Sequence, residues 1–491
     1  MLINNSIAKH LSHIASWLAI GLTCLFISGC AVGPNYVKPD SKSPANWHSP
    51  LPNSLNSGSQ SLATWWQTLE DPLLTSLIER TVAGNLDLKK ARAKVREARA
   101  RRGLSQTDLF PTLTANASNL HSETKQNNPQ NIGTRAGNTT QTRDLYSAGF
   151  DAGWELDIFG GVRRSIEAAD ADLQANQEAL RDVLVSLLAE TALNYVEVRS
   201  SQNQLAVAES NLAIQQETYT LTQFRYQAGL SDDLAVQQAK ANLENTRSQI
   251  PSLRSTLTAA QNRLAVLTGE TPGALEKELA EPKPMPLPAP EIPVGVPAET
   301  LRQRPDVRQA ERQLAAQTAR IGVATAELYP KISLSGSIGI EASSFGNLFS
   351  EYTRTLSYGP RITWKIFDAG AVRRNMEAQS AVRDQSLYQY GSKILIALEE
   401  TENALTAYAN EQIRQQALMA AAQAATAAAD LSQKKYEAGL VDFQVVLDSQ
   451  RSLLSAQNQL AQSQGSVVKN LITLYKALGG GWTALAPEEK Q

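Results

Sequence analysis

Cysteine and histidine are scarce in this chain of 491 residues. Its two cysteines are Cys24 and Cys30, and it has four histidines. No two histidines have the spacing of metal ligands, and no Ser/His/Asp set or phosphate-binding loop is present. These absences argue against a zinc site and against a Cys/His nucleophile. We therefore expect a protein that is not an enzyme and that carries no metal or other cofactor.

The chain also lacks an excess of charge of one sign. It has 46 Lys and Arg against 48 Asp and Glu, a formal net charge of −2, which gives no indication of nucleic-acid binding. Aromatic residues make up only 6% of the chain, whereas Ala, Gln, Leu and Ser are abundant. This composition suits long helices better than a compact enzyme core.

A long hydrophobic run is missing as well. The apolar stretch Ile14–Ile27 is too short and too interrupted for a membrane span of about 20 residues. It follows Lys9 and ends in small residues before Cys30, as a secretory signal does. Small residues directly before a cysteine resemble the lipobox of bacterial lipoproteins. That resemblance implies cleavage after residue 29, lipid on Cys30 and, because Ala31 is not aspartate, sorting to the outer membrane. An uncleaved anchor or an ordinary secretory signal is the alternative.

Internal repetition is the strongest signal in the sequence, and it indicates two copies of one unit. Identical residues recur 219 and then 210 positions apart, so the first copy has a longer connection between these two sets. The pairs include Asp87/Asp306, Gly103/Gly322, Pro111/Pro330, Trp154/Trp364, Gly160/Gly370, Arg164/Arg374, Glu167/Glu377 and Gly229/Gly439. A Pro-rich stretch, residues 281–297, joins the copies as an extended strap.

These signals predict six segments. They are a signal peptide (1–29), a lipidated N-terminal segment with an equatorial region (30–84), the first repeat (85–280), a Pro-rich linker (281–304), the second repeat (305–481) and a C-terminal tail (482–491). Each repeat is expected to contain one helix, two strands and two long helices.

The predicted strands alternate apolar and polar side chains, which is typical of a half-buried strand. They are residues 112–117, 146–158, 332–340 and 358–366, with exposed loops at 123–143 and 342–355. Their lengths match strands that cross an outer membrane, with the apolar side toward lipid and the polar side toward a wet lumen. A soluble sheet packed on helices is the alternative. The charged residues expected to face the lumen, where they would tune ion traffic, are Asp151, Glu155, Asp157, Arg361 and Lys365.

The predicted helices fall into two classes. Shorter helices, about residues 86–108 and 306–327, end before an aromatic-Pro pair. Longer helices carry apolar residues every seven positions, which marks helices that pack lengthwise. These residues are Val236, Leu243, Ile250, Leu257 and Leu264, with Val446, Leu453, Leu460, Val467 and Leu474 210 positions later. Ala-Gly-Leu turns at residues 228–230 and 438–440 predict two antiparallel helical hairpins, and Pro251 should bend one of them locally.

Four strands cannot close a barrel, and an open edge in lipid leaves backbone groups unpaired. If the strands span the membrane, the protein must therefore oligomerise. Two copies would supply eight strands and three copies would supply twelve. The heptads alone do not select between these numbers.

Three further motifs resemble the lipoprotein (OprM-like, NodT) branch of the TolC family of outer-membrane factors. They are the start Cys30-Ala-Val-Gly33-Pro34-Asn-Tyr36, the motif Trp65-Trp66-Gln-Thr-Leu-Glu-Asp71-Pro72-Leu73, and Tyr475-Lys-Ala-Leu-Gly-Gly-Gly-Trp482. The resemblance covers the mature chain and implies an α+β membrane protein. It would form a trimer with a twelve-stranded outer-membrane β-barrel, four strands per chain, that continues as a long α-helical barrel in the periplasm.

The same resemblance implies the outer-membrane channel of a tripartite efflux pump. The protein would be a passive exit duct for small molecules, joined through a periplasmic adaptor to an inner-membrane transporter, of the RND type. Two alternatives stay open: a duct for type I protein secretion, and a structural coiled-coil lipoprotein without a channel.

Two sets of site residues follow from the resemblance. The hairpin tips Gly229, Leu230, Gly439 and Leu440 would meet the adaptor, although turn geometry alone also accounts for the glycines. Asp448 and Arg451 resemble the family's periplasmic gate, where an acidic ring and a nearby arginine hold the tunnel shut and favour cations. The first repeat has Gln238 and Ala241 at these positions. A solvated salt bridge within one helix is the alternative.

Overall fold

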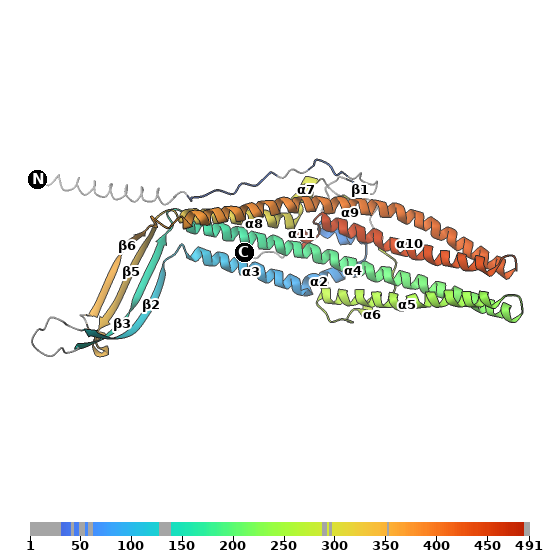
Figure 1. Ribbon diagram of the computed structural model, residues 1–491, viewed down its shortest axis with the longest axis horizontal. Helices are drawn as coiled ribbons and strands as arrows, with labels where there is room; N and C mark the ends of the chain where they lie inside the picture. The colour runs from blue at the N-terminus through green and yellow to red at the C-terminus, as the bar shows by residue number, and fades with distance from the viewer. Residues whose placement is uncertain are drawn as a thin grey trace, which may run out of the picture. The chain divides into compact units, whose positions relative to one another are not determined.

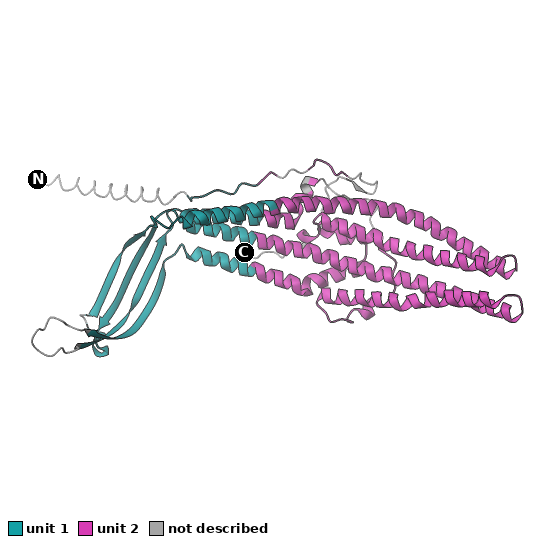
Figure 2. Ribbon diagram, viewed as in Figure 1, with its two compact units in different colours: residues 1–38, 96–174, 312–388 teal, residues 39–95, 175–311, 389–491 magenta. Residues whose placement is uncertain are grey.

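The computed structural model describes residues 31–40, 44–48, 55–56, 62–126, 139–286, 292–293, 297–350 and 353–485. The predicted signal peptide and Cys30 lie outside the described residues. The chain divides into two compact units (Figure 2). Unit 1 contains residues 1–38, 96–174 and 312–388, and unit 2 contains residues 39–95, 175–311 and 389–491.

The two repeats have the same order of elements, as predicted (Figure 1). The first repeat consists of α3 (Leu86–Thr107), β2 (Thr112–Gln126), β3 (Thr139–Leu156), α4 (Gly161–Gln227) and α5 (Asp233–Thr268). The second consists of α8 (Pro305–Ala326), β5 (Lys331–Ala342), β6 (Arg354–Thr363), α9 (Ala371–Glu437) and α10 (Phe443–Ala477). Helices α4 and α9 are each 67 residues long, so the duplication is preserved in three dimensions.

Shorter elements connect and flank the repeats. They are β1 (Leu55–Asn56), η1 (Leu62–Leu69), α2 (Pro72–Gly84), α6 (Glu276–Leu279), β4 (Ile292–Pro293), α7 (Pro297–Gln303), η2 (Phe345–Asn347) and α11 (Trp482–Leu485). Strands β1 and β4 pair in parallel. Among the described residues, no helix combines the length and the apolar composition that a membrane crossing requires.

Unit 1 contains an antiparallel sheet with the strand order β2-β3-β5-β6. Its register places side chains of like polarity in rows across all four strands. One row contains Ala115, Phe150, Ile338 and Leu356, and the row on the opposite face nearer the helices contains Glu155, Ser333 and Arg361. The sheet therefore has one apolar face and one polar face, as the alternation of the sequence predicted.

Several strand boundaries differ from the prediction, and β6, for example, is Arg354–Thr363 rather than residues 358–366. Strands β2 and β3 pair as far as Gln126↔Thr139, so part of the predicted loop 123–143 is strand. Backbone pairing continues there although the side chains are polar on both faces, and such a segment has no apolar periodicity to mark it as a strand. Strand β3 also ends at Leu156, because the next residue, Asp157, already caps helix α4.

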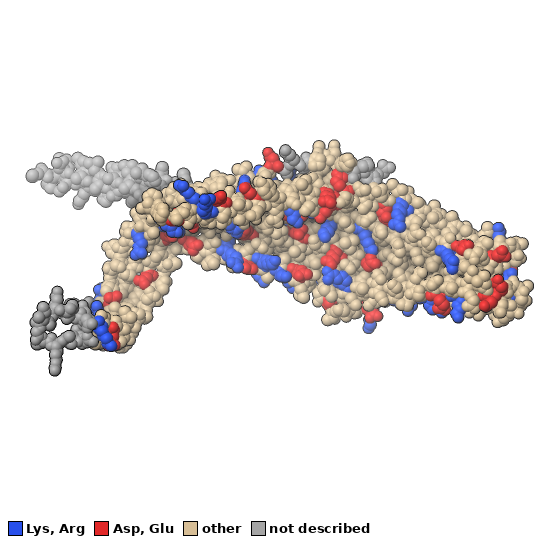
Figure 3. Space-filling model, in the orientation of Figure 1, with Lys and Arg blue, Asp and Glu red and all other residues tan. Residues whose placement is uncertain are grey.

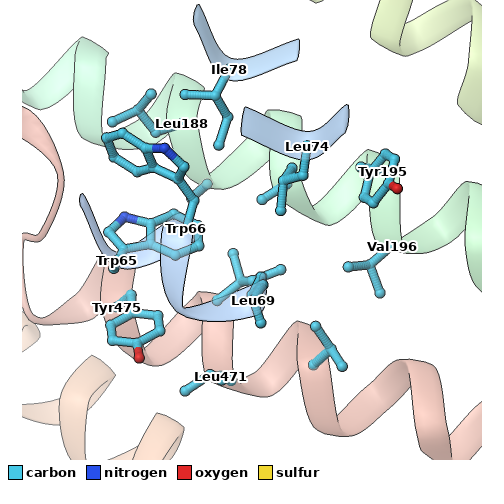
Figure 4. Packing of buried hydrophobic residues seen from close by; sticks show 14 of the residues in the cluster. Trp65, Trp66, Leu69, Leu74, Ile78, Leu188, Tyr195, Val196, Leu471 and Tyr475 are labelled. Atoms are coloured by element: carbon cyan, nitrogen blue, oxygen red, sulfur yellow. The ribbon is translucent and has the colours of Figure 1, made fainter. Parts of the chain in front are cut away.

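The core of unit 2 joins residues that are far apart in the sequence. Trp65 and Trp66 of η1 are only 3% and 2% exposed. The Trp65 ring stacks on Tyr475 of α10 with 5.1 Å between centroids, and Leu188 of α4 lies in the same cluster (Figure 4). Burial of this cluster attaches the segment before the first repeat to the last long helix.

The predicted heptads provide the packing faces of α5 and α10. Val236, Leu243, Ile250 and Leu264 are buried on α5, and Val446, Leu453, Val467 and Leu474 are buried on α10. Leu257 and Leu460 are only partly buried. Charged side chains of both signs are interspersed over the visible face of these helices (Figure 3). Each return helix therefore packs through an apolar stripe and carries a mixed polar surface, as the seven-residue period predicted.

Candidate functional site

The polar face of the sheet carries three of the five residues that were predicted to face a lumen. Glu155 and Arg361 flank Ser333 in one row, and Asp151 pairs with Ser337 further along β3. Lys331 lies 3.8 Å from Glu155, and Asn116 donates a hydrogen bond to Asp151. This face therefore presents both signs of charge among serine and threonine hydroxyls.

The other two predicted residues lie beyond the strands. The Asp157 carboxylate accepts hydrogen bonds from the backbone N–H groups of Val162 and Arg163, at 3.0 and 2.9 Å, and from Arg163 Nε at 3.1 Å. It thus caps the first turn of α4 and neutralises the positive end of the helix dipole. Lys365 follows the end of β6 in the connection to α9.

The two hairpin tips have nearly identical geometry. Gly229 and Gly439 have φ angles of +70° and +72°, in the left-handed region that glycine favours. The N–H groups of Leu230 and Leu440 reach back to the helix, each with a 2.8 Å hydrogen bond to a carbonyl five residues earlier. This pattern is a helix C-cap that reverses the chain. It leaves Leu230 and Leu440 with 69% and 73% of their surface exposed.

The predicted gate residues lie near the start of α10 and are both exposed. Gln444 Nε2 donates a 3.0 Å hydrogen bond to Asp448, whereas Arg451 Nε donates to Asn242 of α5 at 3.3 Å. Within the described part of the chain, Asp448 and Arg451 do not pair with each other. The alternative of a simple salt bridge within one helix is thus not what the structure contains.

Sequence reasoning missed the buried arginines Arg164, Arg199 and Arg304. Arg304, before α8, binds Asp306, Glu400 and the carbonyl oxygen of Ala477. Arg164, in the first turn of α4, binds the segment that follows Cys30. Arg164 and its repeat counterpart Arg374 indicate only the duplication in the sequence.

Burial and charge act together around Arg304. Burial would lower the pKa of its guanidinium, but hydrogen bonds and the negative charges of Asp306 and Glu400 outweigh it and raise this pKa. Burial would raise the pKa of Asp306, and the hydrogen bond and charge of Arg304 reverse this, so the Asp306 pKa lies below its ordinary value. Asp182 lines a cavity of about 560 Å³ beside these two residues, and burial followed by repulsion from Asp306 raises its pKa.

Comparison with known proteins identifies the family. The model of the family described as "Outer membrane efflux protein" matches residues 77–270 and 296–480, which is most of the chain and one match per repeat. The chain belongs to this family. It is an outer-membrane channel of efflux pumps with a periplasmic helical extension, and it is not an enzyme. The predicted outer-membrane localisation, the periplasmic helical part and the four antiparallel strands per chain are thereby confirmed.

Relatives of this outer membrane efflux protein match over nearly their full length. "Nodulation protein T" of Rhizobium leguminosarum bv. trifolii is 32% identical over 467 residues, 94% of this chain and 97% of the relative. "Probable efflux pump outer membrane protein TtgC" of Pseudomonas putida is 31% identical over 473 residues, 95% of this chain and 96% of the relative. The solved structure of the outer-membrane channel OprN is 37% identical, with a TM-score of 0.85 over 92% of this chain and all of that one.

Proposed function

We propose that three copies of this chain form one passive exit duct for small molecules. Their sheets would close into a barrel of twelve strands, and their long helices would form the wall of a periplasmic tunnel. A lipid on Cys30 would anchor each copy in the outer membrane. A periplasmic adaptor would join the duct to an inner-membrane transporter of the RND type.

The observation that carries this proposal is the sheet itself. The sheet has two edge strands, β2 and β6, which pair on one side only within the chain. Its apolar face is uncovered, since Leu113, Leu356 and Ile362 are 72%, 66% and 68% exposed. Exposure of such an apolar face to water is unfavourable, whereas its contact with lipid is favourable. Lipid in turn does not tolerate an unpaired edge, because nothing there can bind the free backbone groups. Pairing β6 of one copy with β2 of the next satisfies both requirements.

The internal repeat predicts the register of this pairing between copies. Within the chain, Gly153 of β3 pairs with Ser335 of β5. Thr363 is 210 positions after Gly153, and Asn116 is 219 positions before Ser335. If the contact between copies repeats the contact within the chain, Thr363 of one copy pairs with Asn116 of the next. Both residues then lie on the polar face, so the two faces continue around the barrel.

Cross-linking of paired cysteines tests the trimer and the register together. The only cysteine expected in the mature chain is the lipidated Cys30, so introduced thiols have no competitor. Asn116→Cys combined with Thr363→Cys should oxidise in outer-membrane preparations to covalent dimers and trimers on a non-reducing gel. Asn116→Cys combined with Ser357→Cys is the matched control, because six residues separate Thr363 from Ser357, roughly 20 Å along a strand. Monomers from the first pair, or equal cross-linking by the control, would contradict the proposed register.

The hairpin tips would provide the adaptor contact. Two leucines with most of their surface in water at the ends of long hairpins suit insertion into an apolar pocket of a partner. A photoreactive amino acid at Leu230 or Leu440 should capture the adaptor in cells that contain the complete pump. The same amino acid at Ser248, an exposed position on α5 well away from the turn, should not. Capture from Ser248 alone would move the contact to the side of the hairpin.

The gate would be formed by Asp448 and Arg451. Three exposed carboxylates around one axis would make a negative constriction. Hydrogen bonds would hold these side chains in place, from Gln444 to Asp448 and from Arg451 to Asn242. Residues of α5 and α10 therefore contribute together, although the two charged residues, Asp448 and Arg451, both belong to the second repeat.

A further inference from the structure

We propose that Arg164, with the helices beside it, forms a binding site for the first residues of the mature chain. This site would hold the lipid-bearing Cys30 next to the turn between β3 and α4. The proposal rests on the lipidation of Cys30 proposed above, but the binding site itself lies among described residues of unit 1.

Arg164 is almost completely enclosed, with a side chain that is only 5% exposed. Its Nε donates to the carbonyl oxygen of Val32 at 3.0 Å, and its Nη2 donates to Asn35 Oδ1 at 2.7 Å and to the carbonyl oxygens of Ala31 and Gly33 at 3.4 and 3.3 Å. Its Nη1 binds Glu167 at 2.7 Å. The planar fork of a guanidinium can serve all these acceptors together, which a lysine cannot do.

The backbones in this site approach one another closely. A Cβ atom on Gly33 would lie 2.5 Å from the Cα of Gly322 in α8, and one on Gly160 would lie 2.6 Å from the Cα of Ala31. The N–H of Val32 donates a 3.1 Å hydrogen bond to the carbonyl oxygen of Phe159. Side chains would not fit at these glycines, so the site is shaped for an extended backbone.

Aromatic packing continues the contact along the segment. Tyr36 packs against the alanines Ala171, Ala315 and Ala316, which belong to α4 and α8. The guanidinium of Arg312 lies over the Tyr36 ring, 5.5 Å from its centroid. The segment 31–36 is thus bound by polar contacts at its start and by an apolar contact at its end.

Binding of this segment restricts the lipid. Consecutive Cα atoms are about 3.8 Å apart, so a lipidated Cys30 that precedes the bound Ala31 would be held near the turn that follows β3. If residues 31–38 were released, the lipid could move roughly 25 Å from the same point. Arg164 is therefore a positioning residue that would keep the acyl chains beside the sheet at the membrane surface.

The second repeat contains a matched control for this site. Arg374 is the counterpart of Arg164 and binds Glu377 at 2.7 Å, as Arg164 binds Glu167. The Arg374 side chain is nevertheless 82% exposed. The Arg–Glu pair alone therefore does not bury the guanidinium. The N-terminal segment and α8 enclose Arg164 together, since a Cβ atom on Gly322 of α8 would lie 2.8 Å from Arg164 Cδ.

Hydrogen exchange in the full-length protein, produced in cells that process lipoproteins, tests the proposal. Arg164→Ala should make the peptide that contains residues 31–38 exchange faster, on the order of tenfold or more, because several charge-assisted hydrogen bonds are lost. Arg374→Ala should leave this peptide unchanged. Asn35→Ala removes one acceptor without touching α4, so it should give a smaller increase and serves if Arg164→Ala does not fold.

Unchanged exchange in both Arg164→Ala and Asn35→Ala would overturn the binding site, as would equal acceleration by Arg374→Ala. The mass of the N-terminal peptide separates this outcome from failure of the lipid assignment. If that peptide carries no acyl group in the unaltered protein, the lipid anchor is refuted, while the exchange rates still decide whether Arg164 binds the segment.

Discussion

Arg304 Nη1 donates a 2.9 Å hydrogen bond to the carbonyl oxygen of Ala477, and Asn85 makes the equivalent 3.0 Å bond to the carbonyl oxygen of Leu267. Asn85 is 219 positions before Arg304, and Leu267 is 210 positions before Ala477. Both repeats thus use the residue before their first helix to bind the end of their last helix. Only the second repeat does so with a charge, which two carboxylates then balance.

Removal of the Arg304 charge should destabilise unit 2. Arg304→Met leaves Asp306 and Glu400 without their buried partner, a change that costs about 3–5 kcal/mol when one member of a buried pair is lost. The purified protein in detergent should unfold at a lower temperature, measured by circular dichroism. Arg302→Met, at an exposed position on α7, is the control. Equal unfolding midpoints for Arg304→Met and the unaltered protein would show that the ion pairs of Arg304 make no net contribution to stability.

Acidification should remove the unfavourable free energy of the buried, ionised Asp182 carboxylate. Burial and then the charge of Asp306 raise the Asp182 pKa above its ordinary value of 3.8, so folding favours the protonated form. The ionised carboxylate therefore lowers stability at neutral pH, and this penalty disappears as the pH falls through the raised pKa. Asp182→Asn should unfold at a higher temperature than the unaltered protein at pH 7, and the two midpoints should converge toward pH 4. Asp430→Asn, on the exposed surface of α9, should leave the unfolding midpoint unchanged at both pH values. A constant difference at all pH values would rule out titration of Asp182 as the cause.

Loss of the gate residues should enlarge the channel current. In Asp448→Ala with Arg451→Ala, the negative ring and its neighbouring cation are both removed, so single-channel conductance in planar bilayers should rise and cation preference should fall. Gln238→Ala provides the control, since it alters the equivalent position of the first repeat, where residue 241 is already alanine. A double variant with unaltered conductance and selectivity would place the constriction elsewhere.

Alanine at the hairpin tips should be costly, whereas alanine in the middle of α9 should not. Gly229→Ala or Gly439→Ala places a side chain at a positive φ angle, which costs roughly 1–2 kcal/mol. Gly391 lies inside α9, and a methyl group added there would meet open space, so Gly391→Ala should stabilise the helix by up to about 1 kcal/mol. Hydrogen exchange should be faster at each altered tip and slower around residue 391. A change of the exchange rate in the same direction at all three positions would contradict this prediction.

Local patterns in the sequence were sufficient for the type and order of the main helices and strands, but not for all of their boundaries. Helix and strand periods, the aromatic-Pro stops and the Gly-Leu turns depend on neighbouring residues, so the repeat order and both hairpins were predicted correctly. The alternation in β3 also predicted which residues share a face. The alternation failed at Asp157. In the sequence this residue has the spacing of a polar-face strand residue, and only the backbone conformation shows that it caps helix α4 instead.

The sequence by itself determined the duplication, the element order, the polarity of the sheet faces and the family resemblance, since each depends on spacing along one chain. Only the tertiary structure decided what Arg164 and Arg304 bind. Their partners are 129 and 173 positions away, at Asn35 and Ala477, and many of them are backbone carbonyls that every residue possesses. A contact with a backbone atom leaves no mark on the partner's identity, so folding alone reveals it.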